Sequence, residues 1–371
     1  MIPLLLLACD GPQMSEAFHQ VSVTPTDSAE EVESAFVDSI NAATIDIGLM
    51  VPGLESAAVV EALISAAARG VSVEVVTDID SSGQSGLVAL EDAGLVVQYA
   101  DDAVTYFDFA INADVSWSSD QVVMSNTVLV VDEVDVLSAS TLSEGEGTRL
   151  LWRGRGEDIG GDFAAEHNQI YGGTDASART AFDSLAKSVT DARWSYPTQT
   201  DLSLELWFGP QERLIKRMID SAYSARGSIW LMTDDLADEG MINALYAKAV
   251  DGFDVRVVVG PNFGLSSPNS SAILTRETPG LQKRVLSDVV VPTMMLVDLK
   301  RDRTGRYNTA RGMMLSHPVW SANRLFAGAE VVTDQLVDGN LWVLNDFGAP
   351  SPELTDLEAA FEAAWEAGVA L

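Results

Sequence analysis

The strongest constraint on how this 371-residue chain folds is an internal repeat. The segment ALISAAARGVSVEVV, which starts at Ala62, aligns without a gap with ALYAKAVDGFDVRVV, which starts at Ala244. The alignment places Gly70 on Gly252. In both copies a helical spacing of apolar residues passes through the glycine into an alternating strand. A repeat of this length indicates a duplicated domain.

The similarity of the two halves continues beyond the repeat. In each half an apolar strand ends in aspartate, at 125–132 and 291–298, and a helix closes the half, at 158–173 and 354–368. Because helices and strands alternate, we predict an α/β fold of two tandem sandwich domains with pseudo-twofold symmetry and mixed sheets. We place the first domain at 31–195 and the second at 196–371, with the boundary in the proline-containing segment 193–210.

The charge of the chain disfavours some partners. The sequence has 55 acidic and 22 basic residues, which gives a formal charge of −33 at neutral pH. Such a surface repels phosphate backbones and anionic lipid headgroups, so nucleic-acid binding and nuclease activity are disfavoured. Dense carboxylates with few lysines also suit a protein that stays soluble at high salt. The single cysteine, Cys9, excludes an intramolecular disulfide.

The N-terminal segment MIPLLLLACDG has an apolar run that ends at Cys9. It resembles the lipobox of bacterial lipoproteins. This implies a lipid anchor on Cys9 and a location in the cell envelope, on the periplasmic or outer face of a membrane. We therefore interpret residues 1–30 as a truncated lipoprotein signal followed by a polar tether. The other interpretation is a buried or disordered N-terminal cysteine without lipid.

The order of elements in both halves, with the segments DFAAEHNQIYGG, LSHPVWSA and DGNLWVLND, resembles the phospholipase D superfamily over nearly the whole chain after residue 30. That family carries the signature His-x-Lys-x4-Asp once in each half. The resemblance implies that the two halves meet and bring both signatures to one site. There one histidine would attack phosphorus, the other would protonate the leaving oxygen, and the lysines would stabilise the phosphoryl charge.

Both copies of the signature are degenerate in this sequence. The histidine, lysine and aspartate positions of the two halves fall, in chain order, on Ser125, Thr127, Asp132, Val291, Thr293 and Asp298. The serine that follows each signature in the family falls on Ser140 and Ser316. Both aspartates remain, but neither histidine nor lysine does. Loss of the central groups of such a site costs several orders of magnitude in rate, so the resemblance implies a pseudoenzyme.

The residues that stand at these positions have structural interpretations. Asp132 and Asp298 close apolar strands, and we expect them to accept backbone or interdomain hydrogen bonds rather than to coordinate a metal. Thr127 and Thr293 either share a hydrogen bond across the pseudo-twofold interface or are alike by chance. Ser125 has no visible neighbouring base, so we expect its hydroxyl to bond to the backbone. We predict no metal and no other cofactor.

Further candidate site residues lie close to the second signature. His317 follows that signature, and a basic loop spans residues 300–311. The arginines of this loop that we assign to a groove are Arg301, Arg303 and Arg306. Together they would suit a phosphate- or carboxylate-binding site. Otherwise His317 is a structural turn residue and the loop is a solvated segment that offsets local acidity.

The chain has three histidines, and His167 is the one in its central part. It lies on the first closing helix, whose apolar face includes Phe163 and Ile170, and we expect it at the periphery of that helix.

The leading hypothesis is a cell-envelope protein that keeps the central groove of the fold and acts in binding or as a scaffold, without phosphodiester chemistry. Its ligand is unidentified, and a phosphate-bearing or anionic small molecule fits the arginines. The alternative is a phosphodiesterase or phospholipase with a non-standard active site in the interdomain groove. That site would use His317 and the arginines of the 300–311 loop.

Overall fold

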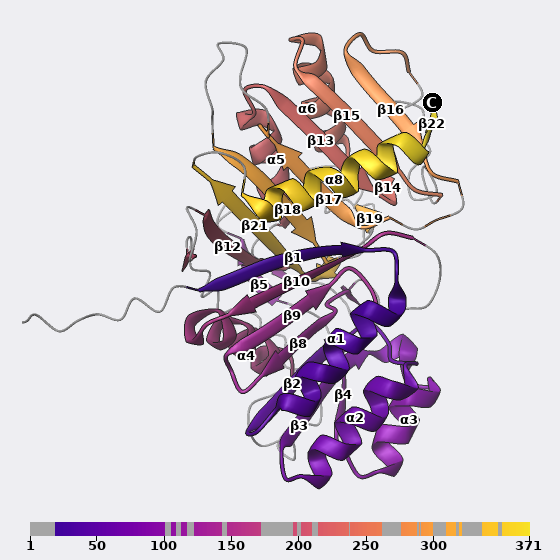
Figure 1. Cartoon of the computed structure of the whole chain (residues 1–371), viewed down its shortest axis with the longest axis vertical. Coiled ribbons are helices and arrows are strands. Elements are labelled where there is room, and N and C mark those ends of the chain that lie inside the picture. Colours follow the sequence, from indigo (N-terminus) through magenta and orange to yellow (C-terminus); the bar gives the residue numbers. More distant parts are fainter. Residues whose placement is uncertain are drawn as a thin grey trace, which may run out of the picture.

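Two large mixed sheets organise the chain (Figure 1). The computed structural model describes residues 19–100, 105–108, 113–116, 122–142, 147–171, 196–198, 202–209, 214–236, 238–261, 276–287, 289, 291–299, 309–316, 319–320, 336–347 and 351–371. All residues of the first sheet lie between Gln20 and Arg155, and all residues of the second lie between Tyr196 and Ala370.

The first sheet has seven strands in the order β1-β10-β9-β8-β2-β3-β4. Strands β2, β3 and β4 are parallel, and the pairs from β2 through β8, β9 and β10 to β1 are antiparallel. Their bounds are β1 Gln20–Thr26, β2 Asp46–Val51, β3 Ser72–Asp78, β4 Val97–Ala100, β8 Val128–Val131, β9 Asp135–Ala139 and β10 Arg149–Arg155.

The second sheet has nine strands in the order β11-β12-β21-β18-β17-β13-β15-β16-β22. Its seven central strands, from β12 to β16, repeat the order of the first sheet, which confirms the predicted α/β fold with two copies of one unit. The bounds are β11 Tyr196–Pro197, β12 Leu202–Phe208, β13 Ser228–Thr233, β15 Asp254–Val259, β16 Leu281–Val285, β17 Thr293–Val297, β18 Ala310–Leu315, β21 Asn340–Asp346 and β22 Val369–Ala370.

Short strand pairs complete the described β structure. They are β5 Thr105–Asp108 with β6 Ala113–Ser116, β14 Asp235–Leu236 with β19 Val319–Trp320, and β7 Val122–Met124 with β20 Leu336–Asp338. The last of these pairs joins the two halves, because β7 belongs to the first half of the chain and β20 to the second. A 3₁₀ turn, Ile79–Ser81, follows β3.

The helices lie in separate layers. Helices α1 Ala29–Ala42, α2 Ala57–Ala68 and α3 Ser85–Asp92 pack on one face of the first sheet, and α5 Leu214–Ser224 and α6 Glu239–Val250 pack on one face of the second. The closing helices, α4 Glu157–Tyr171 and α8 Pro352–Ala367, cover the other faces. The repeated glycines Gly70 and Gly252, at φ 91° and 79°, end the equivalent helices α2 and α6 in the left-handed region that glycine tolerates.

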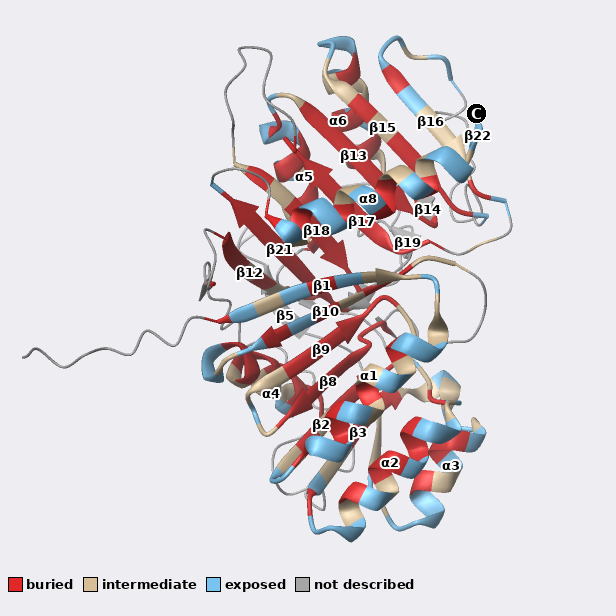
Figure 2. Ribbon diagram, in the orientation of Figure 1, coloured by how far each residue is buried: buried red, intermediate tan, exposed pale blue. Residues whose placement is uncertain are grey.

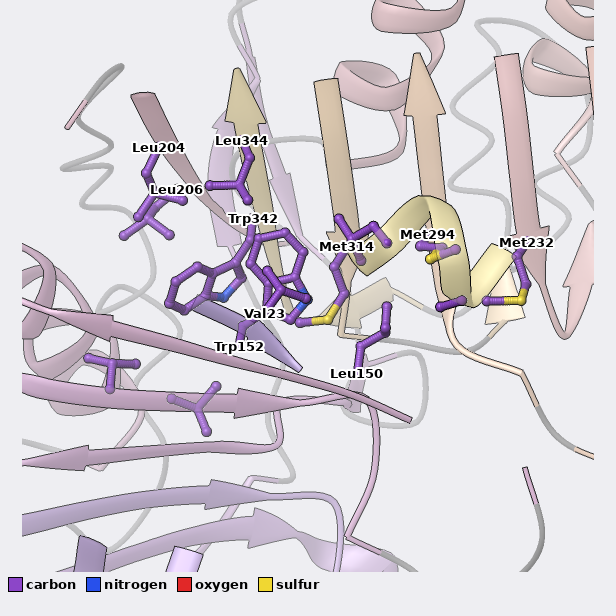
Figure 3. Close-up of a cluster of buried hydrophobic side chains, with 14 of the residues drawn as sticks. Val23, Leu150, Trp152, Leu204, Leu206, Met232, Met294, Met314, Trp342 and Leu344 are labelled. Carbon is purple, nitrogen blue, oxygen red and sulfur yellow. The ribbon is translucent and has the colours of Figure 1, made fainter. Parts of the chain in front are cut away.

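One continuous apolar core joins the two halves (Figure 3). Trp152 of β10 and Trp342 of β21 are fully buried, with ring centroids 5.6 Å apart. Phe163 of α4 meets Phe208 of β12 edge-on at 5.0 Å, and α8 packs against β1. Each closing helix therefore contacts the first strand of the opposite half, and the inner faces of both sheets are buried together (Figure 2).

The prediction that all of residues 1–30 form a signal and tether is wrong for residues 20–26. These residues form β1, which pairs with β10 along its whole length (Figure 1). The segment QVSVTPT alternates apolar and polar residues, and Val23 is 5% exposed in the shared core. Pro25 is tolerated because β1 is an edge strand. Among the described residues, no helix is long and apolar enough to cross a bilayer.

Candidate functional site

The two signature aspartates perform the same structural task. Asp132 accepts hydrogen bonds from the backbone N–H groups of the three residues 44–46, at 2.7–3.2 Å. Asp298 accepts them from residues 226–228, at 2.7–3.3 Å. Both aspartates have positive φ, 52° and 58°, a conformation that aspartate adopts more readily than most residues. The expectation that they accept backbone hydrogen bonds is confirmed, and these bonds stay within each half.

Burial and hydrogen bonding act in opposite directions on Asp132. Burial raises the pKa of this carboxyl, but the hydrogen bonds from Ile45, Thr44 and Asp46 outweigh it and hold the pKa below its ordinary value. The charged form of Asp132 is therefore the one that the loop before β2 stabilises.

The serines after the signatures also occupy matching positions. Ser140 exchanges two hydrogen bonds with Leu150: its N–H donates to the Leu150 carbonyl at 3.0 Å, and its Oγ accepts from the Leu150 N–H at 3.2 Å. Ser316 makes the same pair with Asn340, at 2.9 and 3.0 Å. Leu150 in the first half is thus the structural counterpart of Asn340 in the second.

Asn340 links the two halves through its side chain. Its Nδ2 donates to Asn126 Oδ1 at 2.7 Å, and Asn126 lies between two signature positions of the first half. Asn340 Oδ1 accepts from Trp342 Nε1 at 3.0 Å and from Ser138 Oγ at 3.3 Å. Asn126, Ser138 and Asn340 are fully buried. The sequence did contain a signal for these two residues: in each half an asparagine, Asn126 or Asn340, stands beside an apolar run.

The remaining signature positions lie in the buried interior. Ser125, Thr127, Val291 and Thr293 are at most 4% exposed. Thr293 Oγ1 is 2.9 Å from Thr233 Oγ1, within the second half. The Asn126–Asn340 bond, in contrast, joins the two halves. These four positions therefore provide buried hydroxyl and methyl groups and no charged side chain.

Several predicted site residues lie outside the described residues. They are Cys9, Arg301, Arg303, Arg306 and His317. Within the described ranges, no group of three histidine, cysteine or acidic residues could hold a metal ion.

The two described histidines lie elsewhere in the first half. His19 Nε2 is 3.6 Å from Asp158 Oδ2, and burial lowers the pKa of His19 against the opposing effect of Asp158. His167 is 3% exposed, so the expectation of a peripheral His167 is wrong. Its ring stacks on Tyr171 at 5.4 Å and packs against Gly48, which has no side chain to exclude it. Burial lowers the pKa of His167 to about 4, so the imidazole is neutral at pH 7.

Comparison with solved structures identifies the fold. The chain is similar to phosphatidylserine synthase from Haemophilus influenzae Rd KW20, with a TM-score of 0.63, 10% identity, and coverage of 96% of this chain and 90% of that one. It is also similar to polyphosphate kinase from Porphyromonas gingivalis, with a TM-score of 0.56 and 12% identity. That match covers 93% of this chain but half the length of the kinase. The fold is that of the duplicated phospholipase D-like proteins.

Other comparisons add little to the phospholipase D-like assignment. The phospholipase D family member Nuc from Salmonella typhimurium overlaps 40% of this chain at 17% identity with a TM-score of 0.31, which is too low to bear on the fold. No protein-family model matches the sequence, and no curated protein does. At identities of 10–12% the similarity establishes the phospholipase D-like fold and leaves the activity open.

Proposed function

We propose that this chain is a catalytically inactive phospholipase D-like protein that acts in binding or as a scaffold. The observation that carries the proposal is the burial of the replaced signature. Where the resemblance places two histidines and two lysines, the chain has Ser125, Thr127, Val291 and Thr293, each at most 4% exposed. Hydroxyl and methyl groups thus stand in place of a nucleophile, an acid and two cations.

The chemistry of phosphodiester cleavage explains why these replacements matter. An imidazole can attack or donate a proton near neutral pH, whereas a serine or threonine hydroxyl needs an adjacent base. Val291 has no donor, acceptor or nucleophile. The charge that develops on phosphoryl oxygens also needs fixed cations or aligned donors, and Thr127 and Thr293 carry no charge.

Steady-state hydrolysis by the full chain tests the proposal. The full chain is needed because β1 begins at Gln20 and is part of the first sheet. The substrates are bis(p-nitrophenyl) phosphate and phosphatidylcholine vesicles, and the control is His317→Ala. We expect no turnover above buffer for either protein. Turnover that disappears in His317→Ala would favour the rival phosphodiesterase with a rebuilt site.

The proposed setting is the cell envelope, with a lipid anchor on Cys9. The proposed ligand is a phosphate-bearing or anionic small molecule, for which Arg301, Arg303 and Arg306 are the candidate contacts. Mass spectrometry of the mature N-terminus tests the anchor: an N-terminal Cys9 with added lipid mass is expected, and an unmodified Met1 or Cys9 would refute it.

A further inference from the structure

The two halves of the fold carry different charges at one pair of equivalent positions. The alignment of Ser140 with Ser316 places Arg311 on Asp135. The sheet register agrees, because Asp135 pairs with the last residue of β8 and Arg311 pairs with the last residue of β17. Two more arginines of the second half stand where the repeat has uncharged residues in the first, Arg217 on Ala35 and Arg226 on Thr44. The second half therefore has arginines at three places where the first half has none.

In the first half the charge at this place is paired. Asp135 forms an ion pair with Arg153, whose Nε donates to the carboxylate at 2.9 Å. In the second half Arg311 donates to two neutral acceptors instead, from Nε to Asn345 Oδ1 at 3.1 Å and from Nη1 to Ser224 Oγ at 3.0 Å. Among the described residues, the partly buried Arg311 guanidinium therefore has no carboxylate in contact, whereas Asp135 has its counterion.

Two carboxylates act on Arg311 through their charge, and both are bound to other groups. Glu205 Oε2 accepts from Arg217 Nε at 3.1 Å and from Arg217 Nη2 at 2.7 Å. Glu205 Oε1 accepts from Asn345 Nδ2 at 2.8 Å. Asp298 is held by the backbone N–H groups of residues 226–228. Three guanidinium groups thus share two carboxylates that are already occupied, and a positive charge is left over.

The electrostatics of Arg311 reflect this excess of positive charge. Burial lowers the pKa of its guanidinium, and the positive charges of Arg217 and Arg226 lower it further. The charges of Glu205 and Asp298 oppose this effect without reversing it. The charged form of Arg311 is therefore less well stabilised in the folded protein than in water. A bound anion would remove this cost, because it supplies the missing negative charge.

We propose that Arg311 and Arg226 bind the phosphate group of a small molecule. Guanidinium groups present N–H donors in a planar arrangement that matches the oxygens of a phosphate. Arg226 is exposed and Arg311 is partly buried, so the anion reaches the two side chains from solvent. Arg217 keeps its bonds to Glu205 and contributes charge rather than contact.

The site is separate from the degenerate signature. Thr293 pairs with the last residue of β18, whereas Arg311 pairs with the last residue of β17, so the two lie at opposite ends of this strand pair. At about 3.3 Å per residue the separation along the strands is about 13 Å. The inference rests on the proposed binding function for its class of ligand, an anion, and assigns the contact to arginines other than Arg301, Arg303 and Arg306.

Titration of the full chain with inorganic phosphate by isothermal calorimetry tests the proposal. The titration is made at low ionic strength, because salt screens the charges of exposed side chains. We expect saturable binding at one site with a Kd at or below about 1 mM. Acetate, with a single charge and two oxygens, should bind at least about tenfold more weakly. No saturable binding of phosphate to the wild-type protein would overturn the proposal.

Single arginine variants locate the site. Arg226→Gln and Arg311→Gln should each weaken phosphate binding about tenfold or more. Because Arg226 is exposed, its variant keeps the fold even if Arg311→Gln does not. Arg155→Gln, at an exposed position of β10 in the first half, removes the same charge and should leave the affinity unchanged. An equal loss in Arg155→Gln and Arg226→Gln would overturn the proposal.

A combined variant separates this site from the contacts named in the proposed function. It replaces Arg301, Arg303 and Arg306 with glutamine. If phosphate binding is lost in the combined variant and kept in Arg226→Gln and Arg311→Gln, the contacts of the proposed function are supported and the present site is overturned. Loss in Arg226→Gln and Arg311→Gln supports the present site whatever the combined variant does. The hydrolysis assay is independent of both results.

Discussion

Replacing Asn340 with leucine should weaken the contact between the two halves. Leucine is the residue that the first half has at the equivalent position, Leu150, so the backbone of β21 accepts it without strain. The substitution removes the donor to Asn126 Oδ1 and the acceptor for Trp342 Nε1, and with that acceptor the longer bond from Ser138 Oγ at 3.3 Å. All three partners are fully buried, so water does not replace the lost bonds.

The size of the effect follows from these contacts. Each buried partner that loses a hydrogen bond costs about 1–3 kcal/mol, so the two shorter bonds, to Asn126 and from Trp342, together cost about 4 kcal/mol. The larger apolar side chain returns about 1 kcal/mol of that. The free energy of unfolding should therefore fall by about 3 kcal/mol, a large part of the 5–15 kcal/mol typical of a domain.

Urea unfolding followed by circular dichroism measures this change, with Asn41→Leu on the exposed face of α1 as the matched control. The control should stay within about 0.5 kcal/mol of wild type. A double-mutant cycle of Asn126→Ala with Asn340→Leu should give a coupling energy of about 1 kcal/mol or more. An Asn340→Leu effect no larger than the control, or two additive variants, would refute the reasoning.

Two further predictions follow from the pKa shifts. Asp132→Asn should lower the free energy of unfolding by about 1–2 kcal/mol, because the amide makes weaker bonds to the backbone of residues 44–46. The folded pKa of Asp132 is lowered, so its contribution to stability is present above the unfolded pKa near 4 and is lost as pH falls through the folded pKa. Urea midpoints of both proteins, measured across this pH range, would show the difference. His167→Phe introduces the residue that α8 has at the matching place, because Phe361 stacks on Trp365 as His167 stacks on Tyr171. The folded pKa of His167, about 4, lies below its unfolded value of 6.5, so the wild type should lose about 3 kcal/mol relative to the variant as pH falls from 6.5 to 4, and parallel pH profiles would refute this. The raised pKa values of Glu74 and Asp46 act in the opposite direction in both proteins. Because Glu74 Oε2 is 3.8 Å from His167 Nδ1, the difference between the two profiles reports His167 together with its interaction with Glu74.

The duplicated fold was predictable because its signal is local and occurs twice. Apolar periodicity and the glycines after α2 and α6 appear in both copies at a constant offset, and the two sheets repeat the same strand order. The role of Asp132 and Asp298 was also accessible, since an acidic residue at the end of an apolar strand tends to accept nearby backbone hydrogen bonds.

Other features were missed for identifiable reasons. The edge strand β1 is seven residues long and follows a polar stretch, so its alternation was weak evidence. His167 lies four residues after Phe163 and four before Tyr171, on one face of α4, and this spacing did predict burial. It was overlooked because histidine is usually partly exposed.

An asparagine inside or beside an apolar run marks each half, but the pairing of Asn126 with Asn340 could not be read from sequence. The two residues are 214 positions apart, and a long-range side-chain hydrogen bond leaves no local pattern. The packing of His167 against Gly48 is different, because the repeat itself shows glycine in one copy and tryptophan at the equivalent position, Trp230, in the other. That this glycine makes room for the His167 ring became visible only in the structure.

The central claim is that the site where the two halves meet lacks a nucleophile. Intact-mass spectrometry of the full chain in excess over a phosphodiester substrate tests it most directly, because a single turnover would be visible. We expect no phosphoryl adduct and no released alcohol above buffer over hours. A phosphoryl adduct, or stoichiometric release of alcohol that Ser125→Ala or His317→Ala abolishes, would contradict it.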